Sequence, residues 1–296
     1  MKNLLQNVLL LLPLLLILSC SSSDLSMKVV SFNIRYDNPE DGVNRWEARI
    51  PVVKSYLTEQ KPDIIGMQEV LHNQVLVLQE ILPDYSYVGT GRNDNKTEGE
   101  YAPIFYNTNK FKLIDHSQFW LSETPDIPGS KSWDASLTRI VTWAQLEDKN
   151  SGHKFYAFNT HFDHRGVEAR MESAILMSKK ISEIAGDAPV IATGDFNIRK
   201  DHPSLGNKLY ENLIKSFKEN SSLENSAYIS KSSGTSEGLT STGFRPDWES
   251  KEGHAIDYVF VNDYFEVESH QVDKIVEGNL FISDHWPIVA KVSLIK

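Results

Sequence analysis

The chain has 296 residues, of which 40% are hydrophobic and 24% are charged. This composition is ordinary for a globular protein, so it excludes wholesale disorder and a membrane protein with many spans. The formal net charge is −10 and no basic cluster stands out, which argues against a broad nucleic-acid-binding face, because such faces neutralise many phosphates. A chain of this length forms one large domain by default.

The N-terminal residues differ from the rest of the chain. A leucine-rich run from Val8 to Leu18 is too short to cross a bilayer but has the length of a signal-peptide core. The single cysteine, Cys20, follows this run directly, and the site resembles a bacterial lipobox, in which the thiol is lipidated. We therefore predict that the protein is extracytoplasmic and anchored to a bacterial membrane by that lipid. An ordinary secretory cleavage site with an unmodified thiol is the alternative. The predicted parts are a lipoprotein signal peptide at 1–19, a lipidated tether at 20–26 and one domain at 27–296.

Along the domain, hydrophobic periodicity predicts strands that outnumber helices. The predicted strands cover 27–35, 63–70, 85–90, 102–106, 112–121, 140–146, 155–161, 189–193, 255–261, 264–276 and 288–295. The predicted helices cover 45–60, 74–82, 167–185 and 204–213. Residues 91–100 form a polar loop, and the stretch 221–243, rich in Ser, Gly, Asn and Thr, is predicted to be a surface excursion.

Polar side chains stand at or just beyond the ends of the predicted strands. They are Asn33, Glu69, His161, Asp163, Asp195, Asn197, Asp257, Asp284 and His285. Strand ends can converge on one edge of a sheet, so these residues are predicted to form one site. Oxygen ligands dominate, and a zinc-type set of cysteines or paired histidines is missing from the sequence. We expect Mg²⁺ or Mn²⁺, held by Glu69 with help from Asn33 and Asp284.

Two local motifs strengthen this prediction. In Gly194-Asp195-Phe196-Asn197, residues two apart on an extended backbone point the same way, so Asp195 and Asn197 face the site together. An Asx-turn that closes the strand would explain the same tetrapeptide equally well. Near the C-terminus, His285 can pair with a carboxylate such as Asp257, and an imidazole oriented in this way can take a proton from water.

The motifs together resemble the endonuclease/exonuclease/phosphatase superfamily over residues 27–296. The resemblance rests on Ser31-Phe32-Asn33, Gln68-Glu69-Val70, Asn159-Thr160-His161-Phe162-Asp163, Gly194-Asp195-Phe196-Asn197, Ile256-Asp257-Tyr258 and Ser283-Asp284-His285-Trp286-Pro287, in family order. It implies an α/β (α+β) fold, a four-layer α-β-β-α sandwich with two mixed, mostly antiparallel β-sheets. The pattern looks closest to the bacterial deadenylase-like branch, because the inositol phosphatase motif is missing from 254–260.

The resemblance also implies roles for individual residues. Glu69 and Asn33 would bind the metal, His285 would activate water while Asp257 orients it, and Asp195 would assist the nucleophile or leaving group. His161 and Asn197 would donate hydrogen bonds to phosphate oxygens. Three further residues are candidate substrate contacts: Tyr101, Arg139 and Asp163. Packing against the sheet is the alternative for Tyr101, and simple exposure at a strand end is the alternative for Arg139.

These observations favour a phosphodiesterase that resembles the nucleases and activates water with a His-Asp dyad. A phosphomonoesterase acting on a sugar or lipid phosphate is the second hypothesis, and a catalytically silent binding lipoprotein is the third. The substrate is expected among phosphoesters of nucleic acids, nucleotides, phosphoglycans and lipid head groups. We expect a monomer that contacts the membrane only through its lipid anchor.

Overall fold

The computed structural model describes residues 25–232, 238–250 and 254–295. The predicted signal peptide and Cys20 lie outside these described residues. Within the described part of the chain, no helix combines the length and apolar character needed to cross a membrane.

Most strands belong to two six-stranded sheets. The first sheet has the order β11 (Phe265–Val272), β14 (Ile288–Leu294), β1 (Ser26–Asn33), β2 (Ile64–Gln68), β4 (Ile104–Asn107), β3 (Tyr85–Val88). The second has the order β5 (Phe111–Trp120), β6 (Ile140–Asp148), β7 (Lys154–His161), β8 (Val190–Asp195), β10 (Asp257–Val261), β9 (Glu224–Asn225). A small hairpin joins β12 (Val276–Glu277) to β13 (Leu280–Phe281). In each large sheet one neighbouring pair is parallel, β1 with β2 and β7 with β8, and the other pairs are antiparallel.

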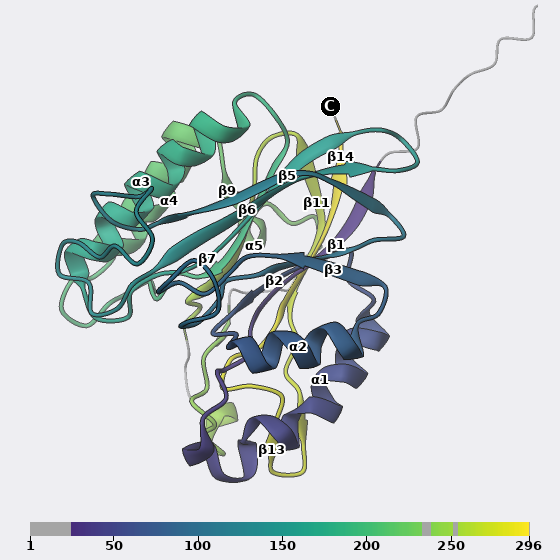
Figure 1. Cartoon of the computed structure of the whole chain (residues 1–296). Helices are drawn as coiled ribbons and strands as arrows, with labels where there is room; N and C mark the ends of the chain where they lie inside the picture. The colour runs from purple at the N-terminus through teal and green to yellow at the C-terminus, as the bar shows by residue number, and fades with distance from the viewer. Residues whose placement is uncertain (1–24, 233–237, 251–253, 296) are drawn as a thin grey trace, which may run out of the picture.

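Helices cover the outer face of each sheet. The helices α1 (Trp46–Gln60) and α2 (His72–Ile81) lie below the first sheet, and α3 (Val167–Ala185) and α4 (Lys208–Ser221) lie on the far side of the second (Figure 1). Two 3₁₀ turns, Pro39–Asn44 and Trp248–Ser250, and the one-turn helix α5 (Ser226–Ile229) complete the described elements. The structure confirms the predicted four-layer α-β-β-α sandwich with two mixed, mostly antiparallel sheets.

Three apolar clusters explain why the strands form this sandwich. Val29 and Ile64 of the first sheet pack with Ile191 of the second in the cluster between the sheets. Residues of opposite parity on the same strands, such as Val30 on β1, face the cluster beneath α1 and α2, and Ala192 on β8 faces the cluster with α3 and α4. Both faces of the central strands are therefore buried, which explains their nearly continuous apolar sequences.

Several predicted boundaries are wrong. Leu25 is buried and β1 spans Ser26–Asn33, so this strand begins one residue before the predicted range 27–35 and ends two residues earlier. The helix predicted at 204–213 instead spans Lys208–Ser221, because its apolar stripe continues through Phe217. The stretch 221–243 is only partly a surface excursion, since its described residues include β9, α5 and the fully buried Thr240.

A buried polar layer replaces the apolar core where the sheets approach the site. Gln68 Nε2 donates to Asn159 Oδ1 at 2.7 Å, and Thr193 Oγ1 donates to the same oxygen at 3.0 Å. Gly66 is required here, because a Cβ on it would lie 1.9 Å from Thr193 Oγ1. Ser31 Oγ accepts a hydrogen bond from the backbone N–H of Gly194 across the two sheets. These contacts fix the first sheet against the second directly beneath the strand ends that carry the site.

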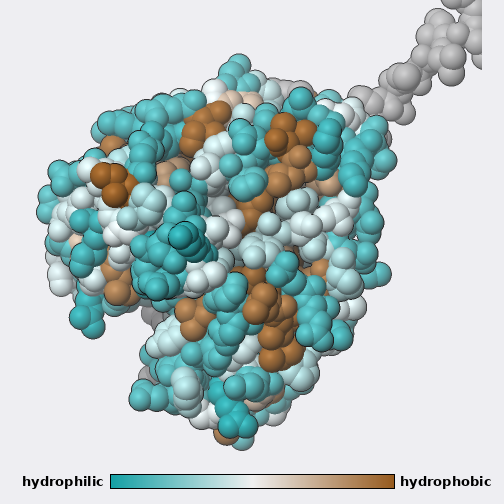
Figure 2. Space-filling view, viewed as in Figure 1, coloured by the Kyte–Doolittle hydropathy of each residue, from teal (hydrophilic) through white to brown (hydrophobic). Residues whose placement is uncertain are grey.

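The outer surface is largely polar. On the face shown in Figure 2, hydrophobic residues form separate small patches among hydrophilic ones. Such scattered apolar exposure is normal for a globular protein.

Candidate active site

A polar cleft of about 540 Å³ lies at one end of the sandwich. Its lining comes from both sheets and from the loops that follow their strands. The lining residues are Arg35, Tyr36, Glu69, Arg92, Glu100, Leu137, Arg139, His161, His164, Asp195, Asn197 and His285. Five of the predicted catalytic and metal residues are therefore in this cleft, together with predicted Arg139.

Strand register explains the convergence. In the second sheet, His161 on β7 pairs with Asp195 on β8, which in turn pairs with Asp257 on β10. In the first sheet, Asn33 on β1 pairs with Gln68 on β2, and Glu69 follows immediately. One end of each of three adjacent strands in the second sheet and of two strands in the first therefore lies at the site.

Asn33 connects the two halves of the site. Its Nδ2 donates to Glu69 Oε1 and to Asp195 Oδ2, both at 3.0 Å. Its Oδ1 accepts from the backbone N–H of Arg35 at 3.0 Å. In this orientation Asn33 presents N–H groups rather than its oxygen to the carboxylates, so it orients Glu69 and Asp195. The predicted metal contact of Asn33 stays a prediction.

Arg35 is a cation beside the acidic residues. Asp41 anchors its guanidinium through two contacts at 3.0 Å. The free Nη1 lies 3.9 Å from Glu69 Oε2 and 3.7 Å from Asp284 Oδ2. Asp284 is therefore linked to Glu69 through Arg35, and its predicted metal contact also stays a prediction. Both Arg35 and Glu69 have left-handed backbone, with φ of 60° and 61°, a strained conformation that proteins often retain at functional sites.

His285 and Asp257 form the predicted dyad. Nδ1 of His285 lies 2.9 Å from Asp257 Oδ2 and 3.1 Å from Oδ1. The hydroxyl of Thr240 donates to Asp257 Oδ2 at 2.6 Å and so fixes the carboxylate. Burial acts to lower the pKa of His285, but the charges of Asp257, Asp195 and Asp284 outweigh it and raise that pKa well above 6.5. Since Nδ1 faces Asp257, Nε2 is the ring nitrogen left for proton transfer.

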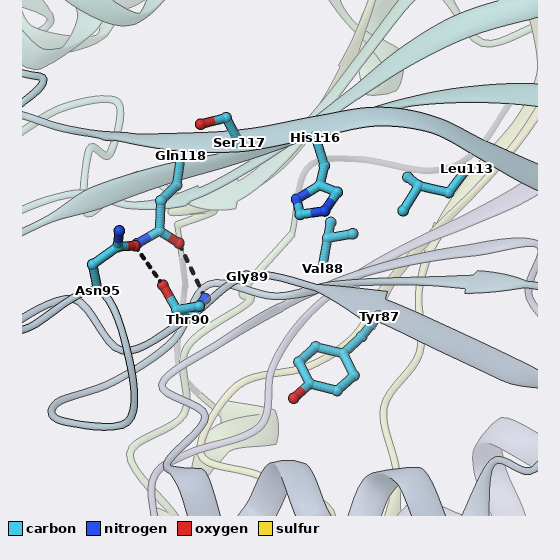
Figure 3. A pocket seen from close by; sticks show the side chains of 9 residues that line it. All are labelled: Tyr87, Val88, Gly89, Thr90, Asn95, Leu113, His116, Ser117 and Gln118. Atoms are coloured by element: carbon cyan, nitrogen blue, oxygen red, sulfur yellow. Dashed lines mark hydrogen bonds between the residues drawn. The ribbon is translucent and has the colours of Figure 1, made fainter.

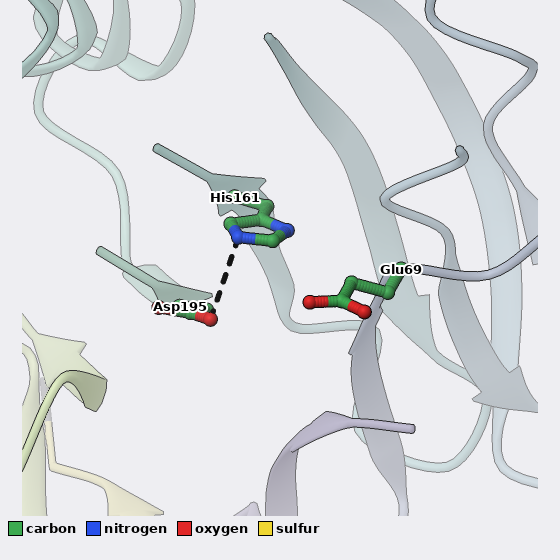
Figure 4. A group of neighbouring side chains, drawn as sticks. All are labelled: Glu69, His161 and Asp195. Carbon is green, nitrogen blue, oxygen red and sulfur yellow. Dashed lines mark ion pairs between the residues drawn. The ribbon is translucent and has the colours of Figure 1, made fainter. Parts of the chain in front are cut away.

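His161, Asp195 and Glu69 form a cluster of one imidazole and two carboxylates in the same cleft, where Asp195 Oδ2 lies 3.8 Å from His285 Nδ1. Figure 4 shows His161 between the two carboxylates, with its Nε2 3.4 Å from Asp195 Oδ2. Asn197 Nδ2 lies 2.9 Å from the same ring nitrogen and also donates to Phe162 O at 3.1 Å. Burial, reinforced by the cations Arg139 and Arg92, holds the pKa of His161 well below 6.5. With Asn197 Nδ2 as the donor to Nε2, Nδ1 is the ring nitrogen that carries the proton of a neutral imidazole.

Asp195 both closes an Asx-turn and faces the site, so both interpretations of Gly194-Asp195-Phe196-Asn197 hold. Its Oδ1 accepts from the backbone N–H of Asn197 at 2.9 Å, which is the Asx-turn, while Oδ2 faces Asn33 and His161. Burial, and next the charge of Asp257, raise the pKa of Asp195 to about 7. A carboxyl group with this pKa exchanges a proton near neutral pH, a property suited to proton transfer.

Two predicted substrate contacts, Tyr101 and Asp163, are not among the residues that line the cleft. The hydroxyl of Tyr101, a side chain only 3% exposed, donates to Lys96 O and contacts His72 Nδ1, both at 2.9 Å. Asp163 accepts hydrogen bonds on one oxygen from Ser136 and Leu137 and on the other from the two backbone N–H groups just before α3. Burial acts to raise the pKa of Asp163, and these hydrogen bonds hold it below its usual range. In the observed geometry the polar atoms of both residues hold neighbouring loops in place, and their contact with substrate stays a prediction.

Several residues of the site were not predicted from the sequence. They are Arg35, Arg92, Glu100, His164 and Thr240. Arg35 carried a usable signal, because it lies two residues beyond Asn33. Arg92 and Glu100 lie at the two ends of a polar loop, and Thr240 lies in a Ser-rich stretch, so no local pattern distinguishes them.

A second cleft of about 540 Å³ lies between the edge strands β3 and β5. Figure 3 shows His116 and Gln118 of β5 directed toward β3, where Gln118 bonds to the backbone N–H of Thr90. The described residues that line this cleft include no Asp, Glu, Lys or Arg. It therefore offers no carboxylate ligand for a hard cation and no Lys or Arg for phosphate.

The donor set of the first cleft fits a hard divalent cation. One ligand atom each from Glu69, His161 and Asp195 lies within 4.8 Å of the others, and Asp195, Asp257 and His285 form a second such group. Oxygen atoms predominate among these ligands, which suits Mg²⁺ or Mn²⁺. The structure thus supports a metal site at Glu69, with Asp195 and His161 as its near neighbours.

The sequence profile of the endonuclease/exonuclease/phosphatase family matches residues 30–285. The chain belongs to the endonuclease/exonuclease/phosphatase family. This result confirms the family resemblance recognised from the motifs. As a member of the family, the chain is a hydrolase of phosphoester bonds.

Individual family members are similar over nearly the whole domain. A family protein from Bacteroides vulgatus is 39% identical with a TM-score of 0.82, covering 92% of this chain and 100% of that one. A Bacteroides thetaiotaomicron structure described as a mannosyl-6-phosphatase is 35% identical with a TM-score of 0.80, covering 91% of this chain and 100% of that one. Mouse nocturnin is 24% identical over 93% of this chain and 67% of its own length. This member of the family is thus similar to Bacteroides proteins and to nocturnin.

Proposed function

We propose that the protein is a Mg²⁺- or Mn²⁺-dependent phosphatase that removes the phosphate from a phosphorylated sugar. The geometry that carries hydrolysis is the His285–Asp257 dyad beside the cluster of Glu69, His161 and Asp195 in one cleft. The sugar phosphate is suggested by the mannosyl-6-phosphatase, which aligns along its entire length at 35% identity. The net charge of −10 also favours a small substrate over a polyanionic chain.

Each side chain has a distinct task in this proposal. His285 takes a proton from the attacking water through Nε2, while Asp257 and Thr240 hold its ring in position. Arg139 lies where it can donate to phosphate oxygens as negative charge develops, while Asn197 holds the ring of His161 through Nε2. Asp195, which lines the same cleft, would assist the departing sugar oxygen.

Glu69 would hold the metal ion, with Asp195 and His161 nearest to it. When bound, a divalent cation would polarise a phosphate oxygen and offset the acidic charge that raises the pKa of His285. A neutral His285 is the form that accepts a proton. The metal and the dyad therefore act together near neutral pH.

Phosphodiester hydrolysis, favoured by the sequence motifs alone, is the second candidate. The observation that favours it is the match to a family whose description names endonucleases and exonucleases, over residues 30–285. Membership in the deadenylase-like branch is part of that candidate. We rank it second because the mannosyl-6-phosphatase is more similar to this chain than nocturnin is.

We also propose that the enzyme works outside the cytoplasm on a lipid anchor at Cys20. The support is the sequence alone, namely an apolar leader followed by a single cysteine. Replacing Cys20 with Ser in the full chain should abolish labelling by a palmitate analogue and release the protein from the membrane fraction. Continued labelling of the variant would contradict the proposal.

The substrate is tested by comparing ester types with the same enzyme. We expect phosphate release from mannose 6-phosphate with Mg²⁺ or Mn²⁺ to exceed, by kcat/KM, the hydrolysis of bis-p-nitrophenyl phosphate and of a single-stranded oligonucleotide. His285→Ala serves as the inactive control for every substrate. Faster cleavage of the oligonucleotide than of the sugar phosphate would replace the first candidate with the second.

A further inference from the structure

Glu100 lies among cations at the wall of the active-site cleft. Its carboxylate contacts Arg92 through two atoms, at 2.6 and 3.1 Å. The same Oε2 lies 3.7 Å from Arg139 Nη1 and 3.8 Å from His161 Nδ1. Arg139 comes from the loop before β6 and His161 from the end of β7, so one carboxylate oxygen lies among three segments of the chain.

Several nitrogen atoms around Glu100 lack hydrogen-bond partners in this arrangement. Arg139 Nε and Nη1, Arg92 Nε and His161 Nδ1 are buried and have no hydrogen-bond partner within the described residues. The distances of 3.7 and 3.8 Å to Glu100 are too long for hydrogen bonds. Buried donors without partners are costly, typically by about 1–3 kcal/mol each, and are rare outside functional sites.

An oxyanion with several oxygen atoms satisfies such donors better than one carboxylate can. Arg139 is only 4% exposed and lines the cleft, so its position is set before a ligand arrives. A phosphate group in the cleft can accept hydrogen bonds from Arg139 and His161 at the same time. Glu100 supplies negative charge to these two residues without supplying the hydrogen bonds.

The side chain of Glu100 has room to rotate. It is 18% exposed and lines the cleft itself, so rotation toward solvent is open to it. Its backbone is held independently, because Glu100 O accepts from the backbone N–H of Arg92 and the next residue, Tyr101, donates to Val70 O. Burial raises the pKa of Glu100 despite its arginine neighbours, which fits a carboxylate that is incompletely stabilised where it lies.

We infer that Glu100 occupies the place of a phosphate oxygen and competes with the substrate for Arg139 and His161. It is a residue that sets the affinity of the cleft for phosphate. The inference rests on the proposed function only in taking the ligand to be a phosphate group. When phosphate binds, the Glu100 carboxylate gives up its contacts with Arg139 and His161 and turns toward solvent.

The test is the affinity of the full-length, Mg²⁺-loaded protein for inorganic phosphate, measured by titration calorimetry. Glu100→Gln keeps an oxygen acceptor for Arg92 but removes the competing charge. We expect phosphate to bind roughly 10-fold more tightly to this variant, as the loss of a close like charge predicts. Glu98→Gln removes an exposed charge from the same loop and should leave the affinity within about twofold, because exposed charges are well screened.

A second pair of variants separates competition from a structural role. If Glu100 competes, Glu100→Ala also tightens phosphate binding. When Arg139 is already replaced by Gln, adding Glu100→Gln should no longer tighten phosphate binding relative to Arg139→Gln alone. If Glu100 instead orients the arginines for phosphate, both single variants bind phosphate more weakly than the wild type, and the inference is overturned. An unchanged affinity in Glu100→Gln overturns it as well. Since phosphate binding is read without turnover, failure to hydrolyse mannose 6-phosphate would refute the proposed function alone.

Discussion

Replacing Gly66 with Ala should destabilise the protein strongly, because the added methyl group has no space. An ideal Cβ at this position lies 1.9 Å from Thr193 Oγ1, 2.7 Å from Asn159 Oδ1 and 2.8 Å from Thr193 Cβ. The Thr193 side chain must move, and its hydrogen bonds to Asn159 Oδ1 and Phe158 O are lost. Overpacking costs about 1–3 kcal/mol, and a buried group left without its partner costs about 1–3 kcal/mol. The free energy of unfolding should therefore fall by about 2–6 kcal/mol, a large share of the ~5–15 kcal/mol typical of a domain.

Urea unfolding followed by tryptophan fluorescence measures this change. The matched control is Gly278→Ala, because Gly278 has a left-handed backbone, with φ of 64°, and open space around its Cβ position. Its cost should be limited to the conformational penalty of about 1–2 kcal/mol. If Gly66→Ala loses no more stability than this control, the reasoning is refuted, because the contact between β2 and the second sheet then has room for a methyl group. Suppression of the loss in Gly66→Ala combined with Thr193→Gly would support the steric explanation.

Three further results are expected. His285→Ala should lower kcat on a phosphate ester by roughly 10²–10⁴-fold, the usual contribution of a general base, with an unchanged circular dichroism spectrum; a loss below tenfold would exclude that role. Chelation with EDTA should abolish hydrolysis and Mg²⁺ or Mn²⁺ should restore it, while Glu69→Gln should need at least tenfold more metal, as expected for loss of a charged ligand; equal metal titrations would refute Glu69 as a ligand. Burial lowers the pKa of His270 to about 4 from 6.5, so the unfolded state binds more protons between these values and stability falls as pH drops from 6.5 to 4. That loss, up to about 3 kcal/mol, should be absent from His270→Asn, and identical pH dependence of unfolding in both proteins would contradict the assignment.

The strands and the major helices were predictable because their signals are local. The apolar stripe of α3 gave both of its ends correctly, from Val167 to Ala185. The helix α4 was placed too early, because the sequence before Lys208 has turn residues that mimic a helical start. The hairpin of β12 and β13 was missed, since strands of two residues carry no periodicity.

The candidate site was predictable where a residue's type and its position at a strand end agree. Asn33, Glu69, Asp195 and His285 were found in this way, and the structure brings them together. Tyr101 was proposed from its position along the chain, whereas the structure shows its hydroxyl in contact with Lys96 O and His72 Nδ1. Position in a motif says nothing of the direction of a side chain.

By itself, the sequence determined the family, the sandwich of two sheets and the chemical types at the strand ends, since apolar periodicity and short motifs depend on neighbouring residues. Only the tertiary structure decided which distant groups meet. The pairing of Thr240 with Asp257 joins two segments, and the position of Glu100 between Arg92 and Arg139 joins three side chains from two loops. The physical reason is that these contacts depend on the packing of one sheet against the other and on loop paths that no local pattern encodes. The affinity of the cleft for phosphate is set by such contacts.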